Sequence, residues 1–282
     1  MPVSPVPRSS YIRCGAHELH VTEWGDPASP PLVMWHGLAR TGRDFDEAAA
    51  ALSDRYFVVC PDTLGRGLSS WAHDEAVDYS YAAFGDHAVA ILDNYGIGET
   101  RWVGTSMGGL IGVTLAGGRL KGRITHLVIN DIGPAIPEAA SGRIAAYVGA
   151  PPVFDTVAEL EDWLRTNYAP FGENTAAFWR RMADTSSRRT DSGKVTVHYD
   201  PHIVTQFTLH KGDLDCWPSY DAVSARTLLL RGETSDVLPR AVAEEMTRRG
   251  PQPELVEFNN VGHAPTLASD SEISLLREFL AD

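Results

Sequence analysis

The sequence predicts an α/β fold, with a mostly parallel, twisted sheet, helices on both faces and an inserted helical cap. Three observations lead to this prediction. Short apolar runs bounded by turn residues recur along the chain, segments with helical spacing lie between them, and one long stretch breaks the rhythm. The first two patterns are typical of buried parallel strands joined by helical crossovers, because helices cover both faces of such a sheet.

The apolar runs are the expected strands, since each is short and bounded by turn residues. They cover residues 31–37, 56–62, 101–106, 124–131, 226–232 and 253–260. Helices are expected between or after them, at 44–54, 81–96, 109–118 and 272–280. Gly96 is expected to end the second of these helices, because glycine readily adopts the left-handed conformation that follows a helix.

From about Pro134 to Trp217 the alternation gives way to helical pieces interrupted by Pro and Gly and rich in aromatic residues. We therefore expect residues 134–217 to form a helical cap, and residues 1–133 and 218–282 to form the core. Aromatic residues of this segment, such as Trp163, either pack the cap onto the sheet or together wall an apolar pocket.

Composition narrows the choice of partners. The 24 Lys and Arg against 37 Asp and Glu give a formal net charge of −13, which argues against nucleic acid and against an anionic membrane. A small-molecule substrate is expected, and the oligomeric state is left open. No apolar run approaches the roughly 20 residues that cross a bilayer, so no membrane association is expected. The three cysteines lack metal-ligand spacing, so we expect neither a disulfide framework nor a metal, and a cytoplasmic location.

The segment GTSMGG, Gly104 to Gly109, is a candidate nucleophile turn of the form Gly-x-Ser-x-Gly. A predicted strand precedes it and a predicted helix follows it. Ser106 would occupy the sharp turn between them, and the glycines would let neighbouring backbone pass closely. The backbone N–H of Met107, at the start of the helix, is then a candidate oxyanion donor. The alternative is a glycine turn with an inert serine.

Two further segments complete a possible serine hydrolase site. His263 lies in NNVGHAP, between the last predicted strand and the last predicted helix, where a general base for Ser106 would lie. The segment WHGLAR ends an early strand, and the backbone N–H of Leu38 in it is the second candidate oxyanion donor. The glycine clusters match neither a phosphate loop nor a dinucleotide fingerprint, so no cofactor is expected.

With HGLAR, PDTLGRGLS, GTSMGG and VGHAP, the sequence resembles the α/β-hydrolase fold family over nearly its whole length, least clearly in the cap. The resemblance implies the α/β-hydrolase fold, and it implies that Asp62, Gly65 and Gly67 build a turn and take no part in the chemistry. Two groups of relatives, haloalkane dehalogenases and epoxide hydrolases, have a carboxylate at the nucleophile position, so Ser106 argues against both.

Two carboxylates compete for the role of the acid that orients His263. The usual family pattern after the seventh strand places an acid three residues after a glycine, but that position from Gly232 is Ser235, and Asp236 is shifted by one. Asp131 ends the family's sixth strand. Small serine esterases of bacteria resemble this arrangement, with the acid after strand six and Gly-x-x-Ser after strand seven. Asp131 is therefore the preferred acid, and Asp236 is the alternative.

The resemblance implies hydrolysis of a carboxylic ester through an acyl-enzyme, since this is the commonest reaction of the family's serine members. A second reading is hydrolysis of a C–C bond or an amide in ring-cleavage catabolism. In that case Arg40, or Arg188 and Arg189 in the cap, would bind a substrate carboxylate. A third reading, of another class, is a ligand-binding or signalling protein on a hydrolase fold.

Overall fold

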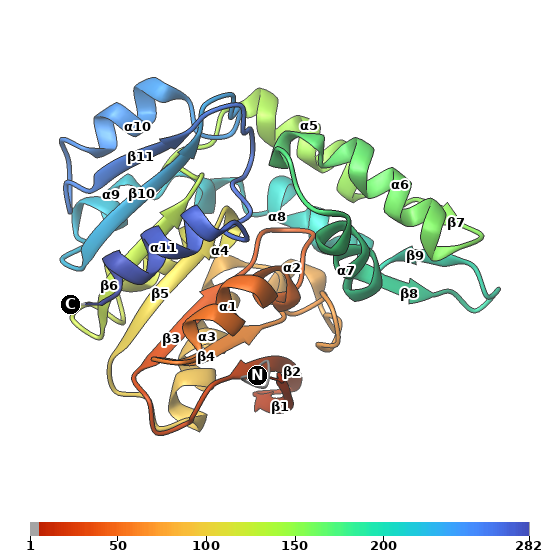
Figure 1. Cartoon of the computed structure of the whole chain (residues 1–282), viewed down its shortest axis with the longest axis horizontal. Coiled ribbons are helices and arrows are strands. Elements are labelled where there is room, and N and C mark those ends of the chain that lie inside the picture. The colour runs from red at the N-terminus through yellow and green to blue at the C-terminus, as the bar shows by residue number, and fades with distance from the viewer. Residues whose placement is uncertain (1–5, 282) are drawn as a thin grey trace.

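The computed structural model describes residues 6–281, and all of their side chains except those of Tyr147 and Lys211. The described residues form an eight-stranded sheet in the order β1-β2-β4-β3-β5-β6-β10-β11 (Figure 1). The strands are β1 (Arg8–Cys14), β2 (His17–Trp24), β3 (Pro31–Trp35), β4 (Phe57–Pro61), β5 (Thr100–Thr105), β6 (Ile124–Asn130), β10 (Arg226–Gly232) and β11 (Glu254–Phe258).

The six predicted strands are β3, β4, β5, β6, β10 and β11, and each pair of neighbours among them is parallel. The prediction of a mostly parallel α/β sheet is confirmed. The first two strands were not predicted: β1 pairs antiparallel with β2, and β2 pairs antiparallel with β4. In β1, polar side chains alternate irregularly with buried ones, because this strand lies at the edge of the sheet.

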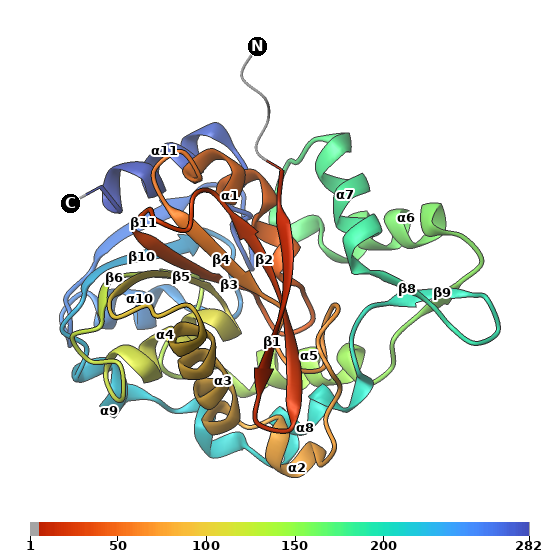
Figure 2. The same cartoon turned by 90° about the horizontal axis from the view of Figure 1, so that it is seen from below.

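Helices cover both faces of the sheet, each over its own apolar cluster. Helices α1 and α11 contribute to one cluster, and α3, α4, α9 and α10 contribute to the other, as the view along the sheet also shows (Figure 2). The core helices are α1 (Asp46–Leu52), α2 (Glu75–Asp78), α3 (Tyr81–Asn94), α4 (Met107–Ala116), α9 (Trp217–Asp221), α10 (Arg240–Met246) and α11 (Asp270–Phe279). No helix among the described residues has the length and apolar character needed to cross a membrane.

The segment predicted as a cap lies to one side of the sheet, over the carboxyl ends of the strands (Figure 1). Its elements are α5 (Glu138–Val148), β7 (Val153–Phe154), α6 (Val157–Asn167), α7 (Ala176–Ser186), β8 (Ser187–Arg189), β9 (Val195–Val197) and α8 (Thr205–Thr208). Strands β7, β9 and β8 form a small antiparallel sheet that the sequence did not predict. The segment's ends lie side by side, since the N–H of Cys216 donates to the carbonyl of Pro134 at 2.7 Å. Its exact boundaries stay a prediction.

Candidate active site

Ser106 lies at the sharp turn between β5 and α4, with φ 52° and ψ −116°. This left-handed conformation is strained for a residue with a side chain, and two glycines make the turn possible. A Cβ on Gly104 would lie 2.2 Å from the carbonyl oxygen of Gly108, and a Cβ on Gly108 would lie 2.0 Å from the carbonyl oxygen of Trp35. The close approach of three backbone segments therefore explains the glycines of the predicted motif.

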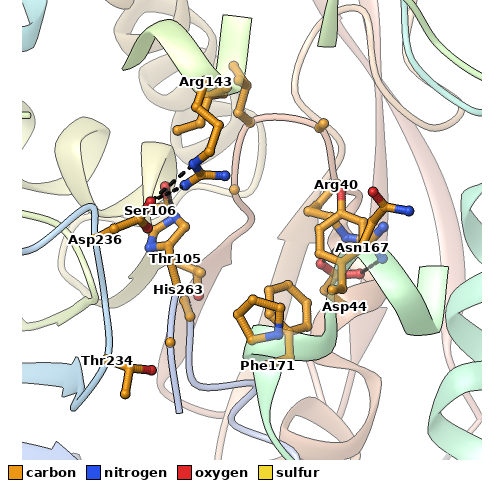
Figure 3. A pocket seen from close by; sticks show the side chains of 18 of the residues that line it. Arg40, Asp44, Thr105, Ser106, Arg143, Asn167, Phe171, Thr234, Asp236 and His263 are labelled. Atoms are coloured by element: carbon orange, nitrogen blue, oxygen red, sulfur yellow. Dashed lines mark hydrogen bonds and ion pairs between the residues drawn. The ribbon is translucent and has the colours of Figure 1, made fainter. Parts of the chain in front are cut away.

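Ser106, His263 and Asp131 form a continuous hydrogen-bonded chain, and Figure 3 shows the first two facing the same cavity. The distance from Ser106 Oγ to His263 Nε2 is 2.9 Å, and His263 Nδ1 lies 2.7 Å from Asp131 Oδ2. An ionised carboxylate only accepts hydrogen bonds, so Nδ1 carries the proton. Nε2 is then the acceptor that faces the serine hydroxyl, which is the arrangement that general-base catalysis requires.

The Asp131 carboxylate is fully buried, with 0% exposure, and three donors hold it. Besides His263 Nδ1, the N–H of Gly232 donates to Oδ1 at 2.8 Å, and the hydroxyl of Ser235 donates to Oδ2 at 2.6 Å. Ser235 is the residue at which the count from Gly232 would place the usual family acid, and its side chain supports the acid on the neighbouring strand. The spacing from Gly232 to Ser235 did not predict this role.

Asp236, the alternative acid, has a different partner. Its Oδ2 accepts hydrogen bonds from Nε and Nη2 of Arg143 at 3.1 and 2.6 Å (Figure 3). The structure therefore brings Asp131 to the His263 ring, and it places the carboxylate of Asp236 in an ion pair with the cap helix α5.

The two predicted oxyanion donors flank the nucleophile. Met107 is the first residue of α4, and a Cβ on Gly37, next to Leu38, would lie 3.6 Å from the Cβ of Ser106. His36 fixes the peptide between Gly37 and Leu38. Its Nε2 accepts from the N–H of Thr63 at 2.9 Å, so its Nδ1 carries the proton and donates to the Gly37 carbonyl at 2.6 Å. The C=O and N–H of one peptide point in opposite directions, so this bond also orients the N–H of Leu38.

Arg66 supports the same loop, a role that was not predicted from the sequence. Its guanidinium is fully buried, and it donates to the carbonyls of Leu38 at 2.8 Å and Leu64 at 2.7 Å. Its Nη2 lies 3.6 Å from the sulfur of Met107. Burial lowers the pKa of Arg66 to about 10, which still leaves it charged at neutral pH. A cation thus contacts both residues expected to form the oxyanion hole.

A cavity of about 620 Å³ opens over Ser106 and His263. The cap contributes aromatic side chains to its wall, namely Trp163, Tyr168 and Phe171, as the sequence analysis allowed. Arg40 also lines it, but its Nε and Nη2 are bonded to the two oxygens of Asp44 at 2.8 and 2.6 Å. The other two candidate arginines lie on β8: Arg188 stacks over Trp71, and Arg189 donates to the carbonyl of Gly193.

A second serine, histidine and aspartate are linked elsewhere in the molecule. The hydroxyl of Ser9 is bonded to Nε2 of His20, whose Nδ1 lies 2.8 Å from Asp62 Oδ2. Asp62 also accepts the N–H groups of Gly42 at 2.7 Å and Leu68 at 3.0 Å, so it holds the turn that the resemblance implied. Ser9 lies within an edge strand and not at a helix N-terminus. We therefore interpret this network as structural.

Acidification is expected to destabilise the protein between about pH 6.5 and pH 4. Burial lowers the pKa of His36 and of His87 from 6.5 to about 4, so both are neutral in the folded protein and take up protons on unfolding in that range. Their contribution is complete above pH 6.5 and is lost as the pH falls towards 4, on the order of 3 kcal/mol for each. Thermal unfolding followed by circular dichroism from pH 7.5 to 4 tests this.

His87 provides the control for this pH dependence, because it lies on α3 against the ring of His17 and does not line the cavity over Ser106. His87→Leu removes one of the two groups, so the free energy of unfolding should depend less steeply on pH in this range. A wild-type protein that is equally stable at pH 7 and pH 4.5 would show that this account is wrong.

Comparison with known proteins agrees with the fold. A family model described as alpha/beta hydrolase fold matches residues 30–268. The chain is 38% identical to a 3-hydroxybutyrate-oligomer hydrolase of Cupriavidus necator, over 98% of this chain and 99% of the relative. It is 25% identical to an esterase of Mycobacterium tuberculosis, over 87% and 79% of the two chains. A crystal structure of an alpha/beta hydrolase from Novosphingobium aromaticivorans superposes with a TM-score of 0.86 and 32% identity, covering 100% and 99%.

Proposed function

Because this chain belongs to the α/β-hydrolase fold family, we propose that it is a serine hydrolase that cleaves carboxylic esters through an acyl-enzyme intermediate. One observation carries the proposal, namely the hydrogen-bonded chain of Ser106, His263 and Asp131 at a cavity of about 620 Å³. A nucleophile bonded to a base, which is itself held by an acid, is the arrangement that activates a serine for acyl transfer.

In the proposed reaction, Ser106 Oγ attacks the ester carbonyl while His263 Nε2 takes the hydroxyl proton. The N–H groups of Leu38 and Met107 stabilise the oxyanion of the tetrahedral intermediate. As this intermediate collapses, the C–O bond to the alcohol breaks and His263 returns the proton to the leaving oxygen. Water then attacks the acyl carbon while His263 Nε2 takes a proton from it. His263 returns this proton to Ser106 Oγ as the acyl–Oγ bond breaks and the carboxylic acid leaves.

The relatives suggest the kind of ester. The chain matches the 3-hydroxybutyrate-oligomer hydrolase over nearly the whole of both proteins, and the relative from Mycobacterium tuberculosis is named an esterase. A cavity of about 620 Å³ is within the range that encloses small ligands. We therefore propose short linear oligoesters of hydroxy acids as the substrate class.

Steady-state turnover tests the proposal. We expect multiple turnovers of the 3-hydroxybutyrate dimer and of short p-nitrophenyl esters, with free 3-hydroxybutyrate as the product from the dimer. A panel containing amides and vinylogous 1,5-diketones tests the alternative of amide or C–C bond hydrolysis. Faster cleavage of these compounds than of esters would contradict the proposed ester hydrolysis. Uptake of one ligand per chain with little product would instead favour a binding protein.

A further inference from the structure

The cavity over Ser106 contains a second ion pair, formed between the cap and the core. Arg143 lies on α5 and Asp236 lies in the loop after β10, and both line the same cavity as His263 (Figure 3). Nε and Nη2 of Arg143 donate to a single oxygen of Asp236, at 3.1 and 2.6 Å. The pair therefore places a cation at the substrate cavity itself.

Arg143 retains donors for another anion. A guanidinium carries five N–H groups, and the two bonds to Asp236 use one on Nε and one on Nη2. Within the described part of the chain, Nη1 has no acceptor. The side chains of Arg143 and Asp236 are 52% and 55% exposed, and an ion pair this exposed contributes little to stability. An entering carboxylate can thus replace Asp236, which then returns to water at low cost.

The other arginine that lines the cavity, Arg40, already has a carboxylate partner. Arg40 is only 6% exposed, it binds both oxygens of Asp44, and it stacks over the ring of Tyr168 at 5.2 Å. Burial by itself would lower the pKa of Arg40, but the neighbouring Asp44 raises it above its ordinary value. Displacing Asp44 would break two hydrogen bonds to a guanidinium that is buried, which is costly. Arg143 is therefore the available cation.

The charges also indicate what kind of anion fits. In the cavity lining, the positive charges of Arg40 and Arg143 balance the negative charges of Asp44 and Asp236. Because only the pair of Arg143 is largely exposed, the lining offers one positive charge that can exchange its partner. A planar carboxylate with one negative charge matches one guanidinium and accepts two parallel hydrogen bonds from it. A phosphate with two charges would lack a second available cation and would be repelled by both aspartates.

We propose that Arg143 binds a free carboxylate of the substrate, and that the preferred substrates are short esters that carry such a carboxylate. The inference rests on the ester hydrolysis proposed above and assigns a specificity residue to it. A linear oligoester of a hydroxy acid ends in a carboxylate, so it has the required group. Before substrate enters, Asp236 occupies the place of the substrate carboxylate and keeps the guanidinium at the cavity.

The experiment compares two substrates of the same size. One is the 3-hydroxybutyrate dimer with its terminal carboxylate, and the other is the same dimer with a carboxamide in place of the carboxylate. Wild-type enzyme should have the higher kcat/KM for the acid. In Arg143→Gln the ratio of acid to amide should fall on the order of 10- to 100-fold, chiefly through KM, because a charge-assisted hydrogen bond to the substrate is lost.

Two variants serve as controls. Arg119→Gln removes an arginine of the core that is 51% exposed and paired with Asp86, so it matches Arg143 in exposure and pairing. It should leave the acid-to-amide ratio at the wild-type value. Asp236→Asn removes the competing carboxylate but keeps Arg143, so the preference for the acid should be retained or increased.

Three results would overturn the inference: a wild-type enzyme without preference for the acid, an Arg143→Gln enzyme with an unchanged ratio, or an Asp236→Asn enzyme that loses the preference as Arg143→Gln does. The last result would mean that the ion pair of Arg143 and Asp236 holds the cap against the core and does not bind substrate. In each of these cases, hydrolysis of the carboxamide dimer by the wild-type enzyme would still support the proposed ester hydrolysis. If neither dimer nor any activated ester is cleaved, the proposed function itself fails.

Discussion

Replacing Ser106 by alanine is expected to lower kcat for ester hydrolysis on the order of 10⁶-fold, as in serine proteases that lose their serine. Alanine removes the only atom of this side chain that can attack a carbonyl, and the 2.9 Å bond from Ser106 Oγ to His263 Nε2 disappears with it. The backbone should be unaffected, because the left-handed φ of 52° is as accessible to alanine as to serine. The measurement is kcat on the 3-hydroxybutyrate dimer, with circular dichroism to verify folding.

Covalent labelling gives this variant a readout that is independent of turnover. An organophosphonate mimics the tetrahedral transition state of acyl transfer, so it should add one label per chain to wild type and none to Ser106→Ala. Ser9 serves as an internal control for the labelling, because its hydroxyl is also bonded to a histidine that contacts an aspartate. Equal labelling of both proteins, or a label mapped by mass spectrometry to Ser9, would show that the nucleophile is misassigned.

Local patterns in the sequence were sufficient to predict most of the core. The six apolar runs are all strands of one sheet, since short apolar runs bounded by turn residues are typical of buried parallel strands. The turn at Ser106 was predictable because Gly-x-Ser-x-Gly between a predicted strand and a predicted helix is a local pattern. The contact that requires Gly108 could not be predicted in this way, because it is made with Trp35 on β3. The N-terminal hairpin was missed, since the mixed polar pattern of β1 reflects its edge position in the sheet, and local sequence does not determine that position.

The parts of the site that the sequence did not predict depend on contacts between distant segments. Arg66 reaches Leu38 across 28 positions, and Arg143 reaches Asp236 across 93. Both contacts require the loops and the cap to be in place. His36 lies within a predicted motif, but its role depends on the N–H of Thr63, which lies in the loop after the neighbouring strand β4. Residue types and spacing indicate a catalytic serine and histidine, but they carry little information on the groups that orient them.

Asp131→Asn is expected to lower kcat on the order of 10⁴-fold, the loss that this substitution causes in a serine-protease triad. The reason lies in the three donors around the buried carboxylate, which are His263 Nδ1, the hydroxyl of Ser235 and the N–H of Gly232. An asparagine has one oxygen and one NH₂ group, so its NH₂ group must face at least one of these donors. Turned towards the ring, it requires Nδ1 to become an acceptor, so the proton moves to Nε2 and the histidine can no longer accept the proton of Ser106.

Asp236→Asn is the matched comparison, since it makes the same chemical change in the other candidate acid. Asp236 is 55% exposed and contacts Arg143 through its carboxylate, so this variant should keep kcat on activated neutral esters within a few-fold of wild type. Both variants should be compared at equal folded fraction, checked by circular dichroism, because Asp131→Asn would also leave a buried donor without an acceptor. If Asp131→Asn kept near wild-type turnover while Asp236→Asn lost it, the acid would have to reach His263 from the loop after β10. The register of Gly232, Ser235 and Asp236 would then differ in solution from the one described.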